Sequence, residues 1–413
     1  MKKTIVFISL LIISLNACFS QELKQKIENI NKEINGYNFK INKLKKEKEK
    51  IQLEYIREQL KEFALPKLEE GEELIEHQAM MLVYSENHEQ AKWVAHIIST
   101  EIIEGSAGRS NDFRPDTNIK TGTAVEKDYF LKYKENGKTV YDGFGYDRGH
   151  LAPSADFKWS KTALSESYFY SNMSPQLADF NREGWAKLEG MLRSYVYENE
   201  IQLFILTGPV LTDKLSPVFR SINKVSVPEY FYKIAFDKEN NRAIGFLVPH
   251  KELEYPIEYY AVSIDSIETF IGIDFFANLN DSLELIIEKQ TNYKPFLPKK
   301  SKFNVAPLKE LSKNCVNSVQ AKQYVNSNKK VTVCGTVVSS HKSRNNHVFI
   351  NLDKAFPNQI FSITIWSSNI VNFSYKPEQE LTGKKICVTG KIIEYEGTPS
   401  MYIDNEKRIE ILD

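Results

Sequence analysis

The sequence of 413 residues predicts an α+β protein built from three successive parts. Apolar residues recur at alternating steps of four and three between residues 23 and 55, which predicts a long helix of coiled-coil type. From about residue 78 the pattern changes to a mixture of strands and helices. Residues 308–413 contain several short strand-like segments separated by polar turns, which is typical of a small all-β barrel.

Residues 1–20 have the features of an export signal. Lysines precede an apolar run from Ile5 to Leu15, which is too short to cross a bilayer comfortably. The segment that ends at Cys18 resembles a bacterial lipobox, in which this cysteine becomes lipidated, and ordinary cleavage after Ser20 is an equal alternative. We therefore expect an exported protein that is periplasmic, cell-surface or extracellular, and membrane-anchored if Cys18 carries a lipid.

Residues 21–65 predict a helical stalk that ends before Pro66. Gly36 weakens the apolar seam, and Lys48 places a charge on it. We expect self-association through residues 23–55, and one long helix packed on its own protein is the alternative. The neighbouring lysines alternate with glutamates, which favours a solvated face over a phosphate-binding one. The seam consists of Leu23, Ile27, Ile30, Ile34, Tyr37, Ile41, Leu44, Lys48, Ile51 and Tyr55.

Charge and cysteine usage restrict the function further. Lys plus Arg and Asp plus Glu both number 54, so the formal net charge is zero, and attraction to a polyanion requires a local basic patch. Beyond Cys18 the chain contains Cys315, Cys334 and Cys387. Export would permit one disulfide among these three and leave one thiol, and the spacing does not fix the pairing.

Segments rich in branched and aromatic residues predict the strands of the second and third parts. The middle part contains three of them, at residues 202–206, 230–236 and 242–248. Prolines and lysines at residues 292–307 predict a linker. In the last part the candidate strands are residues 331–338, 348–352, 361–366, 385–395, 400–403 and 408–412.

The motifs that indicate chemistry lie between residues 146 and 189. Residues 146–153 read Tyr-Asp-Arg-Gly-His-Leu-Ala-Pro, residues 172–176 read Asn-Met-Ser-Pro-Gln, and an Asn-x3-Trp-x2-Leu-Glu pattern follows at residues 181–189. Together they closely resemble the ββα-metal (His-Me finger) DNA/RNA non-specific endonucleases, the family that includes mitochondrial endonuclease G. The resemblance extends from about Gln78 to Asn280 and also rests on residues 109–116, 206–210, 231–233 and 272–276.

The resemblance implies a nuclease domain at residues 78–291 with a central antiparallel sheet, and hydrolysis of phosphodiester bonds in DNA and RNA. His150 matches the motif histidine and is expected to be the general base, a task that suits an imidazole because its pKa lies near the working pH. One divalent ion, Mg²⁺ or Mn²⁺, is expected on Asn181, which would also suit a helix N-cap. Glu189 is about 12 Å further along a helix, so it is expected to reach the ion through water.

Three arginines are expected to hold the phosphate. Arg109 stands where the family has a phosphate-clamping arginine. Arg148 precedes His150 by two residues, so both side chains face the same side of a strand. Arg193 follows Glu189 by four residues on one helical face.

Residues 308–413 resemble an OB-fold of the nucleic-acid-binding type through their strand pattern and three glycines at positions 335, 383 and 390. Aromatic residues on these strands are candidates for stacking on bases, although strand alternation requires half of them to lie in the core. The candidate contact residues are His341, Lys342, Arg344 and His347 in a loop between the first two strands, and Phe349, Phe361, Trp366, Tyr395 and Tyr402.

Two other functions remain open from the sequence. One is a catalytically inactive protein that binds nucleic acid or a surface on the nuclease fold, and the intact set of His150, Asn181, Glu189 and arginines argues against it. The other is a phosphodiesterase with a different substrate, which the sequence does not distinguish from a nuclease.

Overall fold

The computed structural model describes residues 2–104, 107–298, 304–312, 315–343, 346–356, 359–395 and 398–412, with side chains from residue 21 onward except at positions 22, 103 and 104. The chain divides into two units, with the boundary between Gln59 and Leu60. Among the described residues, no helix combines the length and the hydropathy that a membrane span requires.

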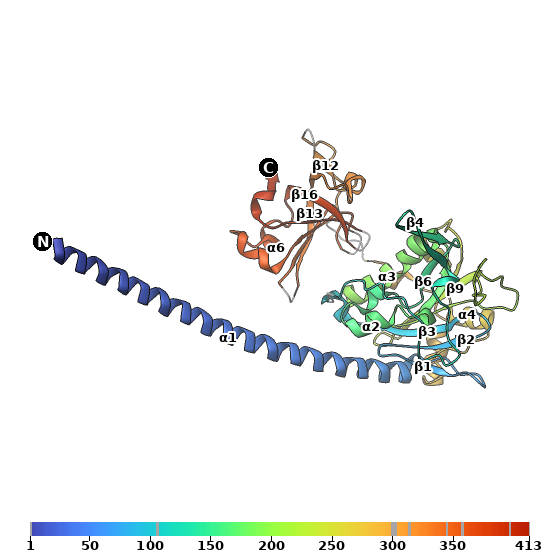
Figure 1. Cartoon of the computed structure of the whole chain (residues 1–413). Coiled ribbons are helices and arrows are strands. Elements are labelled where there is room, and N and C mark those ends of the chain that lie inside the picture. The colour runs from blue at the N-terminus through green and yellow to red at the C-terminus, as the bar shows by residue number, and fades with distance from the viewer. Residues whose placement is uncertain are drawn as a thin grey trace. The chain divides into compact units, whose positions relative to one another are not determined.

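The N-terminal unit lies in α1 (Lys2–Phe63), a single helix that continues through Gly36 (Figure 1). The predicted stalk is therefore helical, and the helix also includes the backbone of the predicted signal segment. The seam residues from Leu23 to Leu44 are exposed, with Ile27 at 58% and Leu44 at 64%. An apolar stripe of this length has no partner within one helix, so self-association remains the prediction for it.

The first part of the second unit is built on a seven-stranded sheet with the order β1-β2-β3-β8-β9-β10-β11. All neighbouring strands are antiparallel. The three strands predicted in this part are confirmed as β8, β9 and β10, whose branched and aromatic side chains are largely buried. The bounds are β1 (Leu74–Glu76), β2 (Met80–Ser85), β3 (Gln90–Ile98), β8 (Leu203–Pro209), β9 (Tyr230–Asp237), β10 (Arg242–Pro249) and β11 (Ala261–Val262).

Four helices accompany this sheet: α2 (Lys161–Glu166), α3 (Ala186–Asn199), α4 (Ile264–Ile271) and α5 (Asp281–Glu288). Local capping explains where α4 begins and ends, because the Ser263 hydroxyl accepts from the Ser266 amide and Gly272 adopts a φ of 77°. Both α4 and α5 contact β10.

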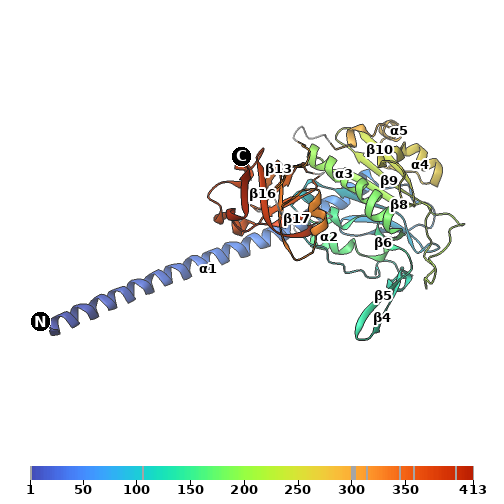
Figure 2. The same cartoon turned by 90° about the horizontal axis from the view of Figure 1, so that it is seen from above.

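Two small two-stranded sheets complete this part. β4 (Phe130–Glu135) and β5 (Lys138–Gly143) form a hairpin, and its Asn136-Gly137 turn has positive φ at both positions, as a type I′ turn requires. This hairpin projects from the domain (Figure 2). β6 (Asp147–His150) pairs with β7 (Met173–Gln176), and a wide π-helical turn, η5 (Phe180–Trp185), then leads into α3. Two strands followed by a helix are the ββα unit that the motifs predict.

The C-terminal strands form a closed barrel, in which β13, β14, β15, β17 and β16 pair in a ring and β16 pairs back with β13. A disulfide joins Cys334 to Cys387 across β13 and β16, and Cys315 is a free cysteine. The predicted barrel is confirmed, whereas its likeness to an OB-fold stays a prediction. The bounds are β12 (Cys315–Asn317), β13 (Lys330–Lys342), β14 (Val348–Leu352), β15 (Ser362–Ile365), β16 (Lys385–Tyr395), β17 (Thr398–Tyr402) and β18 (Ile409–Leu412), with the short α6 (Pro377–Glu380) between β15 and β16.

Two details of this barrel differ from the prediction. His341 and Lys342 were expected in a loop but lie in β13, because cross-strand pairing with Phe349 and Val348 extends that strand. Arg344 lies outside the described residues. Phe361 is fully buried in the barrel core, so it is unavailable for base stacking.

Candidate active site

The ββα unit positions His150 at the end of a short, tightly packed strand. β6 and β7 are paired from Asp147 opposite Gln176 to His150 opposite Met173. A Cβ at Gly149 would overlap the buried side chain of Gln176, so only glycine permits this close approach. Contacts of β7 with β3 anchor the hairpin to the central sheet.

The imidazole of His150 is held in an aromatic pocket. Its ring lies edge-to-face with Tyr168 at 4.9 Å and 5.8 Å from Phe113. Its Nε2 is buried and has no hydrogen-bond partner among the described residues. Burial, together with the positive charges of Arg109 and Arg148, lowers the pKa of His150 to about 3. The ring is therefore neutral at pH 7 and can accept a proton.

Arg148 and Arg109 provide positive charge beside this imidazole. The Arg148 guanidinium stacks 3.5 Å above the centre of the Phe113 ring and donates to the Tyr170 hydroxyl at 3.4 Å. Arg109 is exposed, and its charge acts on both His150 and Glu189. Both arginines thus place positive charge near His150, and phosphate binding by them stays a prediction.

Asn181 lies inside the π-helical turn rather than at a helix N-cap, so the N-cap interpretation is wrong: the residue already has helical pairing, with its amide donating to Leu177 O at 2.9 Å. Its side-chain Nδ2 donates to Asp147 at 3.0 Å, and Asp147 also accepts two bonds from Arg182, at 2.6 and 2.8 Å. This arrangement fixes the amide nitrogen and turns the amide oxygen to the other side, where it can serve as a ligand. Wide turns of this kind occur often at functional sites.

Glu189 and Arg193 lie one turn apart on α3. The Glu189 side chain is only 13% exposed, and Arg193 Nη1 lies 3.9 Å from Glu189 Oε2 and 2.8 Å from Asp156 Oδ1. Burial raises the pKa of Glu189 to about 7, against the opposing positive charges of Lys233 and Arg193. The Arg193 guanidinium is thus already ion-paired, which distinguishes it from the exposed Arg109.

Two buried groups near this site were given no role by the sequence. His96 lies 2.9 Å from the second oxygen of Asp156, so the pair continues the ion-paired network of Arg193. Lys233 is 1% exposed in the middle of β9. A lysine inside an otherwise apolar strand is the sequence signal that could have identified it, since lysine is rarely fully buried without a partner.

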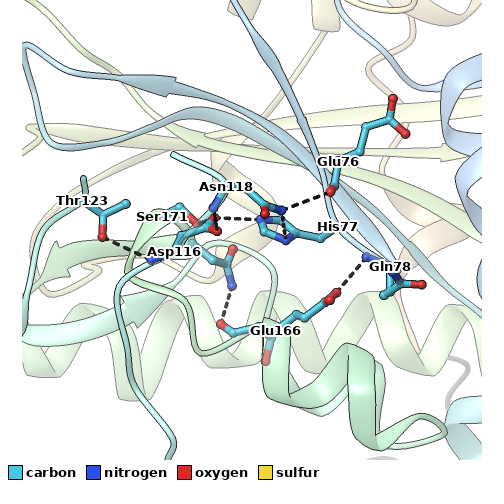
Figure 3. Close-up of polar contacts among 10 residues, drawn as sticks. Glu76, His77, Gln78, Asp116, Asn118, Thr123, Glu166 and Ser171 are labelled. Atoms are coloured by element: carbon cyan, nitrogen blue, oxygen red, sulfur yellow. Dashed lines mark hydrogen bonds and ion pairs between the residues drawn. The ribbon is translucent and has the colours of Figure 1, made fainter. Parts of the chain in front are cut away.

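A second polar cluster holds the segment that carries Arg109 and Phe113 (Figure 3). Asp116 Oδ2 lies 2.8 Å from His77 Nε2 and accepts from the Ser171 hydroxyl at 2.6 Å. Burial alone would raise the pKa of Asp116, but the interaction with His77 lowers it below its usual value. Because Ser171 lies two residues before β7, this cluster ties the segment to the ββα unit.

The donors of the site fit one hard divalent ion. The amide oxygen of Asn181 would be a direct ligand and the carboxylate of Glu189 would act through water, so the protein provides too few ligands for a closed cage. Such a set suits an ion that keeps most of its water shell, which is the behaviour of Mg²⁺.

Comparison with known proteins identifies the family. The family model for DNA/RNA non-specific endonucleases matches residues 64–282, which include the whole central sheet and every site residue described above. A nuclease of Nostoc sp. is 30% identical over 223 residues, covering 51% of this chain and 76% of that protein. A nuclease of Syncephalastrum racemosum is 29% identical, covering 51% and 69%, and mitochondrial endonuclease G of Bos taurus is 28% identical, covering 48% and 67%. The chain therefore belongs to the DNA/RNA non-specific endonuclease family and is a nuclease.

Proposed function

We propose that this chain is an exported, metal-dependent endonuclease that hydrolyses DNA and RNA, with His150 as its general base. The observation that carries the proposal is the neutral, half-buried imidazole of His150, with Nε2 shielded from solvent, beside the arginines Arg109 and Arg148. A neutral imidazole accepts a proton, and adjacent guanidinium groups attract a phosphate.

Hydrolysis of a phosphodiester needs a deprotonated water, neutralisation of the charge on the phosphoryl oxygens, and stabilisation of the leaving oxygen as its bond to phosphorus breaks. His150 takes the proton from the attacking water. Arg109 and Arg148 bind the non-bridging phosphate oxygens, and stacking on Phe113 holds the Arg148 guanidinium in place at 3.5 Å. The approach of an anionic phosphate offsets the positive charges that lower the pKa of His150, so the base strengthens when substrate binds.

Asn181 and, through water, Glu189 would hold one Mg²⁺ or Mn²⁺. When bound, the ion supplies Lewis-acid stabilisation of the phosphate and of the leaving oxygen. Asp147 keeps the Asn181 amide in one orientation through the 3.0 Å bond. Arg193 holds Glu189 near Asp156 and balances the charge of both carboxylates.

Digestion of plasmid DNA and total RNA tests this function. The purified chain should convert supercoiled plasmid to nicked and linear forms and should degrade RNA when Mg²⁺ is present, and excess EDTA should abolish both reactions. Full cleavage in excess chelator would remove the metal from the mechanism. Tight binding of both nucleic acids without cleavage would favour an inactive binding protein.

Export is supported by the lysines and the apolar run of residues 1–20. Fractionation of cells that express the full chain, beside a Cys18→Ser variant, tests it. An exported lipoprotein would incorporate labelled fatty acid only with Cys18 intact, and an exported soluble protein would behave alike in both forms. Retention of both forms in the cytoplasm would contradict export.

The C-terminal barrel is proposed to bind single-stranded nucleic acid. Trp366 lies 4.8 Å from the His347 ring and 5.2 Å from the Tyr402 ring, and Tyr402 is 41% exposed. Such aromatic surfaces stack on bases at about 1–3 kcal/mol per base. Fluorescence anisotropy of a labelled oligonucleotide with the full chain should show weaker binding for Trp366→Ala and at higher salt. Unchanged affinity in Trp366→Ala would contradict this assignment.

A further inference from the structure

Lys233 is a buried lysine beneath the active site. It stands at the centre of β9, opposite Thr207 of β8, and its side chain is 1% exposed. Burying an ammonium group costs several kcal/mol unless hydrogen bonds and opposite charge compensate for it. An apolar side chain at this position would stabilise the core without this cost. The contacts of the ammonium group therefore indicate a role beyond packing.

The ammonium group reaches the backbone that follows the proposed base. Nζ donates to the carbonyl oxygen of Leu151 at 3.3 Å and to the Thr207 hydroxyl at 2.6 Å. Leu151 comes directly after His150, and its own amide donates to the Asn172 carbonyl at 3.0 Å. The backbone after His150 is therefore fixed from two sides, by β9 of the central sheet and by the residue that precedes β7.

The same ammonium group also contacts the turn that carries Asn181. Nζ lies 4.9 Å from the centre of the Trp185 ring, which is fully buried at the end of η5. Cation–π contacts are stronger when both groups are desolvated, as they are here. Since Asn181 lies in the same short turn, one cation links the two elements that carry the base and the amide ligand.

Electrostatics extend this link to a third element. Burial lowers the pKa of Lys233 to about 8, and the carboxylate of Glu189 is the largest opposing influence. In turn, Lys233 is the first of the positive charges that lower the pKa of Glu189 against its burial. At neutral pH the lysine is thus a cation that favours the ionised form of the carboxylate on α3.

We infer that Lys233 is a positioning residue of this nuclease. Its ammonium group holds the backbone that follows His150 and the turn that contains Asn181 in one fixed arrangement. The inference rests on the proposed roles of His150 and Asn181. Lys233 does not touch substrate in this account and acts only through the groups that it holds.

Lys233→Met tests the inference, because it keeps the length and the apolar stem of the side chain and removes the cation. Losing an interaction that orients metal-site groups typically costs about 10–100-fold in activity or metal affinity. We expect a loss of that size in kcat and weaker Mn²⁺ binding by electron paramagnetic resonance, with the KM for DNA within about twofold of wild type. Wild-type kcat and Mn²⁺ affinity in a folded Lys233→Met chain would overturn the inference.

Tyr232→Phe is the matched control on the same strand. Tyr232 is fully buried next to Lys233, and its hydroxyl donates to the Lys92 carbonyl at 2.9 Å, away from His150. Loss of the Tyr232 hydroxyl should lower the melting temperature without changing Mn²⁺ affinity. An equal drop in Mn²⁺ affinity for Tyr232→Phe would mean that general loosening of the sheet explains the effect, and the inference would fail.

A second pair of variants decides the matter if Lys233→Met does not fold. Thr207→Val removes the 2.6 Å acceptor and leaves the lysine in place, whereas Thr207→Ser keeps the hydroxyl. We expect kcat to fall in Thr207→Val and to stay near wild type in Thr207→Ser, and equal kcat in both would overturn the inference. A wild-type chain that cleaves nothing would contradict the proposed function, and Mn²⁺ affinity would still report on Lys233.

Discussion

The carboxyl group of Glu189 titrates where the enzyme is expected to work. Its pKa is raised to about 7, so a proton competes with a divalent ion for this group below neutral pH. Apparent Mn²⁺ affinity should therefore rise about tenfold per pH unit up to about pH 7 and level off above it. Calorimetric titration with Mn²⁺ across this range measures the slope. Affinity that stays level from pH 5.5 to 8.5 would show that Glu189 does not take part in binding.

Asn181 provides the direct ligand in this account. Asn181→Ala removes the amide oxygen, so cleavage should fall strongly, and added Mg²⁺ should restore it only in part, because the site then lacks its direct protein ligand. Arg182→Ala is the matched control: it removes the neighbouring bonds to Asp147 and leaves the amide in place. Comparable losses in the two variants would assign the effect to the Asp147 cluster instead of the ligand.

The motifs identify residues that lie close together in the structure. The charges of Arg109 and Arg148 act on His150, and Glu189 and Arg193 share a face of α3. The catalytic roles of these residues stay predictions. Lys233 and His96 were missed because their partners, Leu151 and Asp156, are far away in the sequence. Only the tertiary fold reveals such long-range contacts.

At the scale of elements, period and composition predicted the strands that form the middle of the central sheet. β8, β9 and β10 are long and rich in branched residues, so their pattern is strong. The π-helical turn of η5 was not predicted. Its wide geometry is stabilised by the bond from Asn181 to Asp147 and by burial of Trp185, and neither contact appears in a local pattern.

The helices α4 and α5 contain an acidic pair that makes stability depend on pH. Glu288 is 8% exposed, and burial together with the negative charge of Glu268 raises its pKa to about 8. Between about pH 4.5 and 8 the unfolded chain loses this proton while the folded chain keeps it, so this group lowers the free energy of unfolding as pH rises.

Glu288→Gln should remove that dependence, because glutamine resembles the protonated form. Its melting temperature should exceed that of wild type at pH 8.5 by about 2–4 °C for each kcal/mol recovered, and the difference should vanish near pH 5. Differential scanning calorimetry at both pH values is the measurement. A difference that is equal at the two pH values would rule out titration of Glu288 as its cause.

For the whole molecule, the exposed apolar seam of α1 predicts self-association. A chain that begins at Pro66 should have a lower oligomeric state than the chain that begins at Gln21, and both should cleave DNA, since every site residue described above follows Pro66. Light scattering measures the oligomeric state. The same oligomeric state above monomer in both chains would place the contact outside the stalk, and two monomers would refute it.

The sequence predicts three parts because each has its own period: heptads in residues 23–55, mixed patterns in the nuclease domain, and short strands in the barrel. The disulfide between Cys334 and Cys387 could not be predicted from the sequence, since it depends on the direct pairing of these two residues across β13 and β16. The position of His341 and Lys342 was missed because pairing extends β13 beyond its apolar core.

The most direct measurement compares wild type with His150→Ala in plasmid cleavage at pH 7.5 with saturating Mg²⁺, alongside the melting temperatures of both. Removing a positioned base should lower kcat by about 10²–10⁴-fold or more. The variant should remain folded, because His150 Nε2 makes no hydrogen bond within the described residues. Cleavage by a folded His150→Ala chain at a rate near that of wild type would contradict the assignment of His150 as the general base.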